Sequence, residues 1–267
     1  MKQDSIKVVQ RELLFLLTTL DGICKENSIK YYITAGSLLG AVREGGFIPW
    51  DDDCDVVMKR GDFRKFLRIM RKKKDDHFTF QDRKTEKKYP FAFVKIRSLR
   101  VLARERGAIW KLLCGGCYVD VFPLDKCPKN PRRAGRFFRF SELFTSVILA
   151  KGDKNFVCGY KNRLARGLFA LLLRLPSSVS VFLRAVVRIY YSLTSSGDML
   201  ATVYGSYGYP RESYRAEWFR SQVYLLFEGR LFPAPIGYRA ILSNMYGDYM
   251  TPPSENNRHT HLKGDLD

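Results

Sequence analysis

Four aspartates stand within five positions, at 51, 52, 53 and 55, beside the apolar strand-like run CDVVM. Carboxylates a few ångströms apart raise one another's pKa, so this density is costly beside a buried strand unless a cation or a basic ligand is present. Alternate side chains of a strand share a face, which points Asp53 and Asp55 the same way. The pair can therefore grip a hard cation such as Mg²⁺ through oxygen. Asp51 and Asp52 fall outside that register and are expected only to shape the turn.

A third acid and a glycine-containing turn extend this pattern. Asp120 alternates with valines in the run YVDVF, and if that strand pairs beside CDVVM, Asp120 completes a triad able to hold one or two divalent ions. Gly36 and Ser37 precede the acids; a glycine lets backbone amides approach a phosphate closely, and the Ser37 hydroxyl with the start of the next helix supplies donors. A phosphate-binding turn at Gly36 and Ser37 beside a metal-binding group of acids is typical of a nucleotidyltransferase site.

Hydrophobic periodicity predicts an α/β (α+β) fold with a mixed sheet and flanking helices over residues 1–127. Residues 128–193 have helical spacing and predict a helical second half, and 200–210 and 232–238 read as loops. The expected elements of the first unit are a helix over 6–23, a strand over 30–34, a tight turn at 35–37, a helix over 38–43, a strand over 54–58, a basic helix over 62–74, a strand over 77–81, a hairpin over 91–97 and 100–103, and a strand over 118–122.

The net charge indicates which kinds of partner the protein can bind, but it does not indicate which reaction the protein catalyses. Lys and Arg number 46 against 27 Asp and Glu, a net charge of +19 that favours phosphate, nucleic acid or an anionic membrane surface. The most apolar stretch, 167–193, is interrupted by Arg174, Pro176, Arg184 and Arg188, too often for a membrane span. Residues 1–10 lack the pattern of a secretory signal, so we expect a cytoplasmic protein whose six cysteines are free thiols.

Four separated blocks resemble the LicD family of phosphocholine transferases, which is itself similar to the fukutin-related proteins. The blocks are GSLLGAVREGGFIPWDDDCDVVM from Gly36, YVDVFPLD over 118–125, FEGRLFPAPIGY over 227–238 and YGDYMTPP over 246–253. The small turn, paired acids and third acid also resemble the wider nucleotidyltransferase fold shared with DNA polymerase beta. Residues 129–216 carry none of these blocks. The resemblance implies a nucleotidyltransferase-like core over 1–127, with a helical region and the C-terminal blocks, 128–267, packed on it.

The resemblance implies a phosphotransferase that uses Mg²⁺ or Mn²⁺ and moves phosphocholine, or a related phospho-alcohol, from CDP-choline or a similar CDP-alcohol. The acceptor is a sugar hydroxyl of a cell-surface or lipid-linked glycan such as lipopolysaccharide, teichoic acid or capsule. Asp53, Asp55 and Asp120 are the implied metal ligands and catalytic residues, with Asp120 accepting the hydroxyl proton. Arg43, Lys95 and Arg97 are basic groups that could reach phosphate oxygens.

Two other functions stay open at this point. A nucleotidyltransferase that moves the nucleotide itself onto a small molecule would use the same triad with attack at the other phosphorus. A nucleic-acid-binding protein has only the net charge in its favour, and no such partner is expected. The basic residues between 129 and 188 predict a solvated helical face, with docking at the inner face of an anionic membrane as the functional alternative.

For the remaining cysteine, histidine and C-terminal motifs, a structural role is favoured over a functional one or stands beside it. Cys114 and Cys117 suggest zinc, but a packed thiol pair is favoured because no second close pair follows. His259 and His261 are expected at the surface or at the substrate. Tyr246, Gly247 and Asp248 are expected to close the fold rather than to contact substrate.

Overall fold

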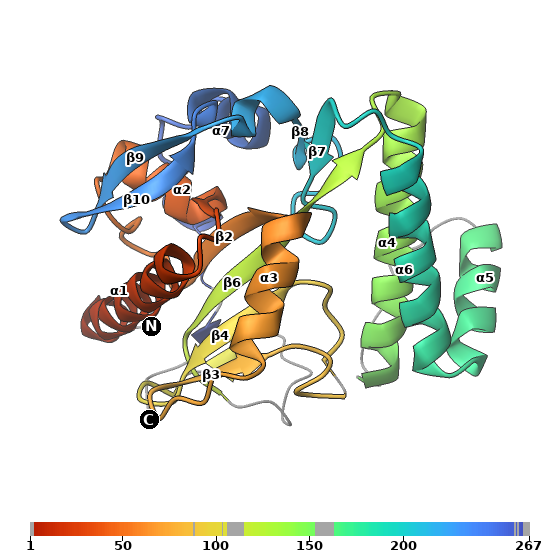
Figure 1. The fold of residues 1–267 in the computed structure, drawn as a ribbon, viewed down its shortest axis with the longest axis horizontal. Helices are drawn as coiled ribbons and strands as arrows, with labels where there is room; N and C mark the ends of the chain where they lie inside the picture. The colour runs from red at the N-terminus through yellow and green to blue at the C-terminus, as the bar shows by residue number, and fades with distance from the viewer. Residues whose placement is uncertain are drawn as a thin grey trace.

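A mixed sheet lies at the centre of the computed structural model, which describes residues 3–87, 89–102, 104–105, 115–152, 163–258, 260 and 262–263 (Figure 1). Its main strands follow the order β1-β2-β6-β4-β3, and β2 pairs with β6 in parallel while the other pairs are antiparallel. The strands are β1 (Tyr32–Ile33), β2 (Cys54–Lys59), β3 (Phe78–Gln81), β4 (Val94–Ser98) and β6 (Tyr118–Cys127). The expected α+β fold with a mixed sheet is confirmed.

Strands from the second half of the chain extend this sheet and form smaller ones. The end of β6 pairs with β7 (Met199–Ala201), which pairs with β8 (Ser213–Arg215). Two further antiparallel pairs join β9 (Gln222–Phe227) to β10 (Arg230–Pro235) and β5 (Arg104–Glu105) to β11 (Leu262–Lys263). Short 3₁₀ helices cover Ala216–Phe219 and Glu255–Asn257.

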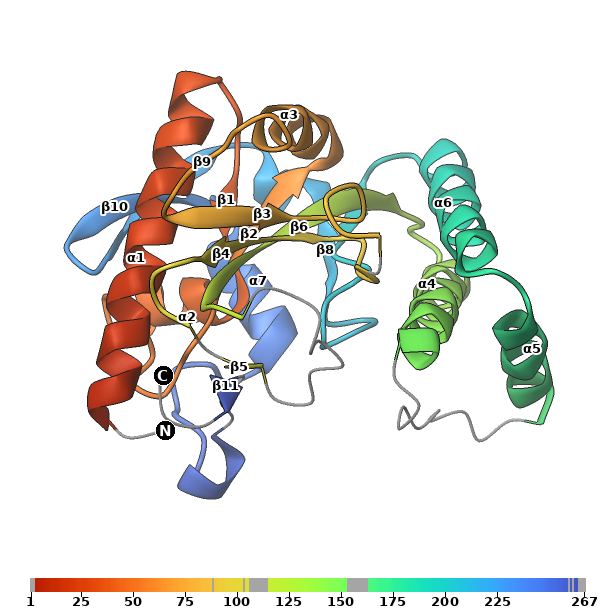
Figure 2. The same cartoon turned by 90° about the horizontal axis from the view of Figure 1, so that it is seen from below.

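Helices cover both faces of the sheet. Figure 2 shows α3 (Arg60–Met70) on one side and α2 (Ala35–Arg43) with α7 (Tyr238–Tyr246) on the other. The first helix, α1 (Gln3–Glu26), turns Val9, Leu13, Leu16 and Leu20 inward, all with no exposed surface. Burying one such leucine or valine side chain is worth roughly 1.5–3 kcal/mol, so this stripe alone explains why α1 packs on the core.

Three helices stand beside the sheet and form the predicted helical region (Figures 1 and 2). They are α4 (Pro131–Gly152), α5 (Arg163–Arg174) and α6 (Ser177–Leu193). The expectation of a solvated basic face is wrong for Arg184, which is 5% exposed and donates to the carbonyl oxygen of Pro90 at 2.7 Å. This buried contact ties α6 to the segment that precedes β4. None of the helices that the structure describes is both long enough and apolar enough to cross a membrane.

Three local predictions are wrong for identifiable reasons. Ala35, Gly36 and Ser37 are not a turn but the first turn of α2. The predicted hairpin over 91–103 does not form, because β4 pairs with β3 and β6 while residues 100–102 are not in a strand. Residues 232–235 belong to β10, where Pro233 and Pro235 are tolerated because β10 pairs with a single neighbour.

The cysteines that the structure describes are free and buried, as predicted. They are Cys24, Cys54, Cys117 and Cys127. Burial raises the pKa of the Cys127 thiol to about 11 and that of Cys117 to about 12, so both are inert packing groups at neutral pH. Cys114, Cys158, His259 and His261 lie outside the described residues.

Candidate active site

The three predicted catalytic acids meet on one face of the sheet. Strands β2 and β6 run in parallel with Asp55 directly opposite Asp120. Neighbouring strands lie about 4.8 Å apart, so these two side chains emerge next to each other. Asp53 lies two residues before Asp55 and therefore on the same side. All three line one cavity, so the two distant stretches of sequence do converge.

This cavity has a volume of about 310 Å³ and lies on the α2 and α7 side of the sheet. Thr34, Ala35 and Gly36 supply one wall from the start of α2, and Met245 of α7 contributes to another. Aromatic rings surround the acids from the sheet and from the segment before β4; these are Phe91, Phe93, Tyr118 and Phe122. An acidic floor within apolar walls is a low-dielectric setting in which a bound cation or phosphate interacts strongly with the protein.

Asp51 is a site residue that the sequence interpretation missed. It shares the alternation of Asp53 and Asp55, and its carboxylate lines the same cavity. A side chain at Gly36 would place its Cβ 2.6 Å from a carboxylate oxygen of Asp51, so the glycine is required for this close approach. The expectation that Asp51 only shapes the turn is therefore wrong. Asp52, by contrast, is fully buried and does not line the cavity.

The acids repel one another. Burial, followed by the charges of Asp53, Asp120 and Asp51, raises the pKa of Asp55 well above its usual value. Burial and then the charge of Asp53 do the same to the pKa of Asp51. Raised pKa values of this kind, caused by desolvation and a specific like charge inside a cleft, are typical of functional sites.

Lys95 counters part of this negative charge. Its ammonium group lies 2.9 Å and 3.0 Å from the two carboxylate oxygens of Asp120, and the side chain is 3% exposed. The same nitrogen lies 3.3 Å from the centre of the Tyr118 ring, and this cation–π contact further stabilises the buried ammonium group. Lys95 therefore holds Asp120 in place rather than lining the cavity itself.

The other predicted phosphate-binding side chains make contacts inside the protein. The Ser37 hydroxyl accepts from the Asp55 amide at 2.9 Å and donates to the Cys54 sulfur at 3.2 Å, so it fixes β2 against α2. Arg97 is 2% exposed and donates to Gln81 and to the Gly116 carbonyl. Neither residue lines the cavity. Their proposed contact with phosphate stays a prediction.

Arg43 lies at the far end of α2 from Gly36. Its guanidinium donates to Glu44 at 2.7 Å and to the carbonyl oxygen of Tyr249 at 3.2 Å, and it does not line the cavity. The contact with Tyr249 ties α2 to the chain that follows α7. The phosphate contact predicted for Arg43 likewise stays a prediction.

A tyrosine-rich loop after β7 forms the remaining wall, and the sequence interpretation treated it only as a loop. Tyr204, Ser206 and Tyr207 line the cavity from this segment, and Tyr207 packs edge-on against Tyr246 at 5.3 Å between ring centres. Glu212 accepts from the Gly208 amide at 2.7 Å, and burial raises the pKa of its carboxyl to about 7. The only signal in the sequence was the clustering of tyrosine and glycine in LATVYGSYGYP.

The C-terminal block YGDYMTPP closes the fold. Tyr246 ends α7 against Tyr207, and Gly247 follows with φ of 71°, a left-handed conformation that suits glycine. Asp248 accepts from the Thr251 hydroxyl at 2.7 Å, and neither Gly247 nor Asp248 lines the acidic cavity.

The donor chemistry of the cavity suits a hard cation, although its side chains are not arranged around one. Carboxylate oxygens from Asp53, Asp55 and Asp120 are the ligands that Mg²⁺ and Mn²⁺ prefer. Across the described ranges, however, no three or more His, Cys, Asp or Glu side chains form a group placed to hold a metal. Asp120, one of the candidate metal ligands, is already paired with Lys95.

Comparison with known proteins agrees with this geometry. Residues 28–128, which carry all four cavity-lining aspartates, match the family model of the LicD/FKTN/FKRP nucleotidyltransferase domain. This match identifies residues 28–128 as a nucleotidyltransferase domain. The chain is 28% identical to the lipopolysaccharide cholinephosphotransferase LicD of Haemophilus influenzae, over 98% of each protein. It is 49% identical over 45 residues, 17% of this chain and 15% of the relative, to an uncharacterized protein of Rickettsia typhi. Residues 28–128 therefore carry a domain of the LicD/FKTN/FKRP type, and the chain is similar to a LicD transferase over nearly its whole length.

Proposed function

We propose that this protein transfers phosphocholine, or a related phospho-alcohol, from a CDP-alcohol to a sugar hydroxyl of a cell-surface glycan. The observation that carries the proposal is the register of Asp55 opposite Asp120, which assembles the acids in one aromatic-walled cavity. The full-length similarity to a lipopolysaccharide cholinephosphotransferase favours choline as the alcohol and lipopolysaccharide as the acceptor.

In this proposal Asp53, Asp55 and Asp120 would hold one or two Mg²⁺ or Mn²⁺ ions, whose positive charge would neutralise that of the donor diphosphate. The acceptor hydroxyl attacks the phosphorus that carries the alcohol, the bond to the cytidine phosphate oxygen breaks in line, and CMP leaves. Asp120, held by Lys95 at the cavity, accepts the hydroxyl proton. The glycine at position 36 and the start of α2 offer backbone amides to the phosphates.

A donor panel tests the reaction class. We expect CMP release from CDP-choline in the presence of Mg²⁺ and a lipopolysaccharide acceptor, with CDP-ethanolamine and CDP-ribitol turned over at least about tenfold more slowly, a specificity of about 1.4 kcal/mol. The acceptor should gain the mass of one phosphocholine. An acceptor that gains a nucleotide instead identifies a nucleotidyltransferase, and salt-dependent DNA affinity without any transfer identifies a nucleic-acid-binding protein.

We further propose that the helical region rests on an anionic membrane surface. Residues 129–197 carry thirteen Lys and Arg and two acidic residues, so this quarter of the chain holds +11 of the net +19. One face of α6 is apolar and uncovered by the described residues; Phe182 is 66% and Leu193 80% exposed, with Val186, Ile189 and Tyr190 between them. An exposed apolar stripe within a strongly basic region is typical of an interfacial helix.

Vesicle binding tests this placement. We expect co-sedimentation with phosphatidylglycerol vesicles at low salt and much less with phosphatidylcholine, because about 1 kcal/mol per basic residue is lost without anionic lipid. Ile189→Glu should reduce binding about tenfold or more. Leu231→Glu, which alters an exposed leucine of β10, is the control and should bind like the parent. Equal binding of all three proteins, or an Ile189→Glu effect confined to self-association, would contradict membrane docking.

A further inference from the structure

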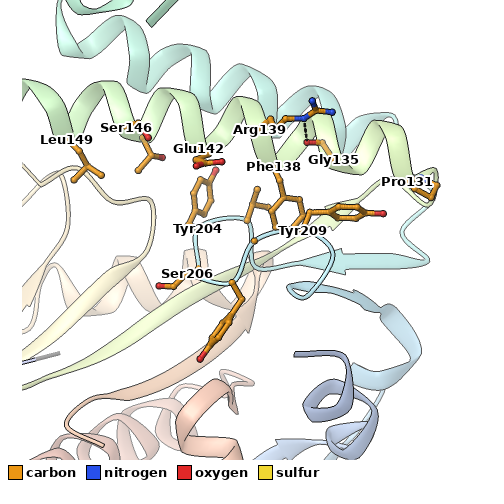
Figure 3. Close-up of a pocket in the computed structure, with 15 residues that line it drawn as sticks. Pro131, Gly135, Phe138, Arg139, Glu142, Ser146, Leu149, Tyr204, Ser206 and Tyr209 are labelled. Atoms are coloured by element: carbon orange, nitrogen blue, oxygen red, sulfur yellow. Dashed lines mark hydrogen bonds between the residues drawn. The ribbon is translucent and has the colours of Figure 1, made fainter. Parts of the chain in front are cut away.

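A second, larger depression lies beside the catalytic cavity, between α4 and the tyrosine-rich loop (Figure 3). Its volume is about 690 Å³, more than twice that of the acidic cavity. Helix α4 lines it with one continuous face from Pro131 to Leu149. At 1.5 Å per residue this face is about 27 Å long, so the depression is an extended groove rather than a compact pocket.

The groove and the catalytic cavity share a wall. Tyr204, Gly205, Ser206 and Tyr207 line both of them. A ligand that lies along the groove therefore has part of its length against the same loop that borders the acids. Because the acidic cavity alone is small, a long substrate must extend beyond it, and the groove lies directly beside it.

The lining of the groove suits a sugar chain. Tyr204 and Tyr209 line the groove from the loop with flat aromatic rings, and the buried Phe138 ring of α4 packs against Tyr209 (Figure 3). Glu142 and Ser146 add hydrogen-bonding groups along the α4 side, and the Glu142 side chain is exposed there. A pyranose ring has apolar C–H faces and a rim of hydroxyls, so it needs both kinds of partner at once. A few polar groups on an aromatic surface also provide orientation and specificity.

We propose that this groove binds the oligosaccharide portion of the acceptor and leads its reactive hydroxyl to Asp120. The proposal rests on the proposed function for the identity of the sugar chain, but the groove itself is defined by geometry alone. An extended chain of several sugars is favoured over the donor nucleotide, because the groove has a single acidic side chain, Glu142, and its one arginine, Arg139, donates to the Gly135 carbonyl of its own helix.

Binding without turnover tests the groove separately from catalysis. Oligosaccharide prepared from delipidated lipopolysaccharide is titrated calorimetrically into the parent protein, into Ser146→Trp, which fills the groove, and into Glu142→Gln, which removes its carboxylate. We expect at least about tenfold weaker binding for Ser146→Trp and a smaller loss for Glu142→Gln. CDP-choline affinity should stay within about twofold of the parent for both.

Arg136→Trp is the matched control, because Arg136 is exposed on the same helix and does not line the groove. It should bind the oligosaccharide like the parent, and Asp55→Asn should also retain this binding while losing transfer. Oligosaccharide binding that persists in a protein without transfer activity would overturn the proposed function and keep the groove assignment. Undiminished oligosaccharide binding by a folded Ser146→Trp, no binding by the parent, or loss of CDP-choline binding instead would overturn the assignment.

Discussion

Asp55→Asn is expected to abolish transfer and, at the same time, to stabilise the metal-free protein. Asparagine keeps the shape of the side chain but removes a charge that binds cation in the proposed mechanism, so kcat/KM should fall on the order of 10³-fold. The free energy of unfolding of the metal-free protein should increase. The folded state raises the pKa of Asp55, so its charged form destabilises the fold. This penalty grows as pH rises from the ordinary pKa of aspartate toward the raised value, and it is constant above that value.

Thermal unfolding in EDTA at pH 8 measures the second effect. Removing one unfavourable buried charge commonly yields about 0.5–2 kcal/mol, which corresponds to a few degrees in Tm for a chain of this size. Adding Mg²⁺ should raise the Tm of the parent by linkage and leave that of Asp55→Asn nearly unchanged. A variant that loses transfer activity but gains thermal stability identifies Asp55 as a functional acid, because the loss of a structural acid would lower the Tm.

Asp76→Asn supplies the control, since Asp76 is exposed and lies outside the cavity. It should retain the activity, the Tm and the Mg²⁺ response of the parent. Full transfer activity in Asp55→Asn would remove Asp55 from the mechanism. A lower Tm in EDTA would mean that the carboxylate supports the fold, contrary to the repulsion described above.

The parts of this site that could be predicted from the sequence are those set by local periodicity. The two-residue alternation of strands placed Asp53 and Asp55 on one face, and an isolated acid between valines pointed to Asp120. The same alternation includes Asp51, which was missed because it lies three residues before β2, in a turn segment that is held partly by tertiary contacts. One of these is the donation from the Gln10 amide to the Asp51 carbonyl oxygen at 3.0 Å.

Features that depend on distant packing could not be predicted. The hydroxyl of Ser37 faces Cys54 and the Asp55 amide rather than the cavity, because α2 begins three residues earlier than its apolar pattern indicates. The wall formed by Tyr204 and Tyr207 comes from residues more than eighty positions after Asp120. Neither relation leaves a periodic signal in the sequence. The first depends on how α2 packs against β2, and the second on how the helical region returns the chain to the sheet.

Asp120→Asn is expected to lower kcat by about 10²–10⁴-fold while the KM for CDP-choline changes less than about threefold. An amide cannot accept the proton of the attacking hydroxyl, and loss of a positioned general base costs a factor of this size. The donor should still bind, because Asp53 and Asp55 remain. A matched fall in kcat and rise in donor KM would place Asp120 in donor binding instead, and an unchanged kcat would remove it from catalysis.

Lys95→Met separates the chemistry of Asp120 from its positioning. Removing one partner of a buried ion pair leaves the other charge uncompensated and costs about 3–5 kcal/mol, so this variant should lose more stability than Asp120→Asn, whose side-chain oxygen still accepts from Lys95. The double variant should be more stable than Lys95→Met, because it no longer buries an unpaired carboxylate, yet remain as inactive as Asp120→Asn. Chemical unfolding and steady-state kinetics of all three proteins measure this cycle. Recovery of turnover in the double variant would show that the carboxylate serves the fold and not the proton transfer.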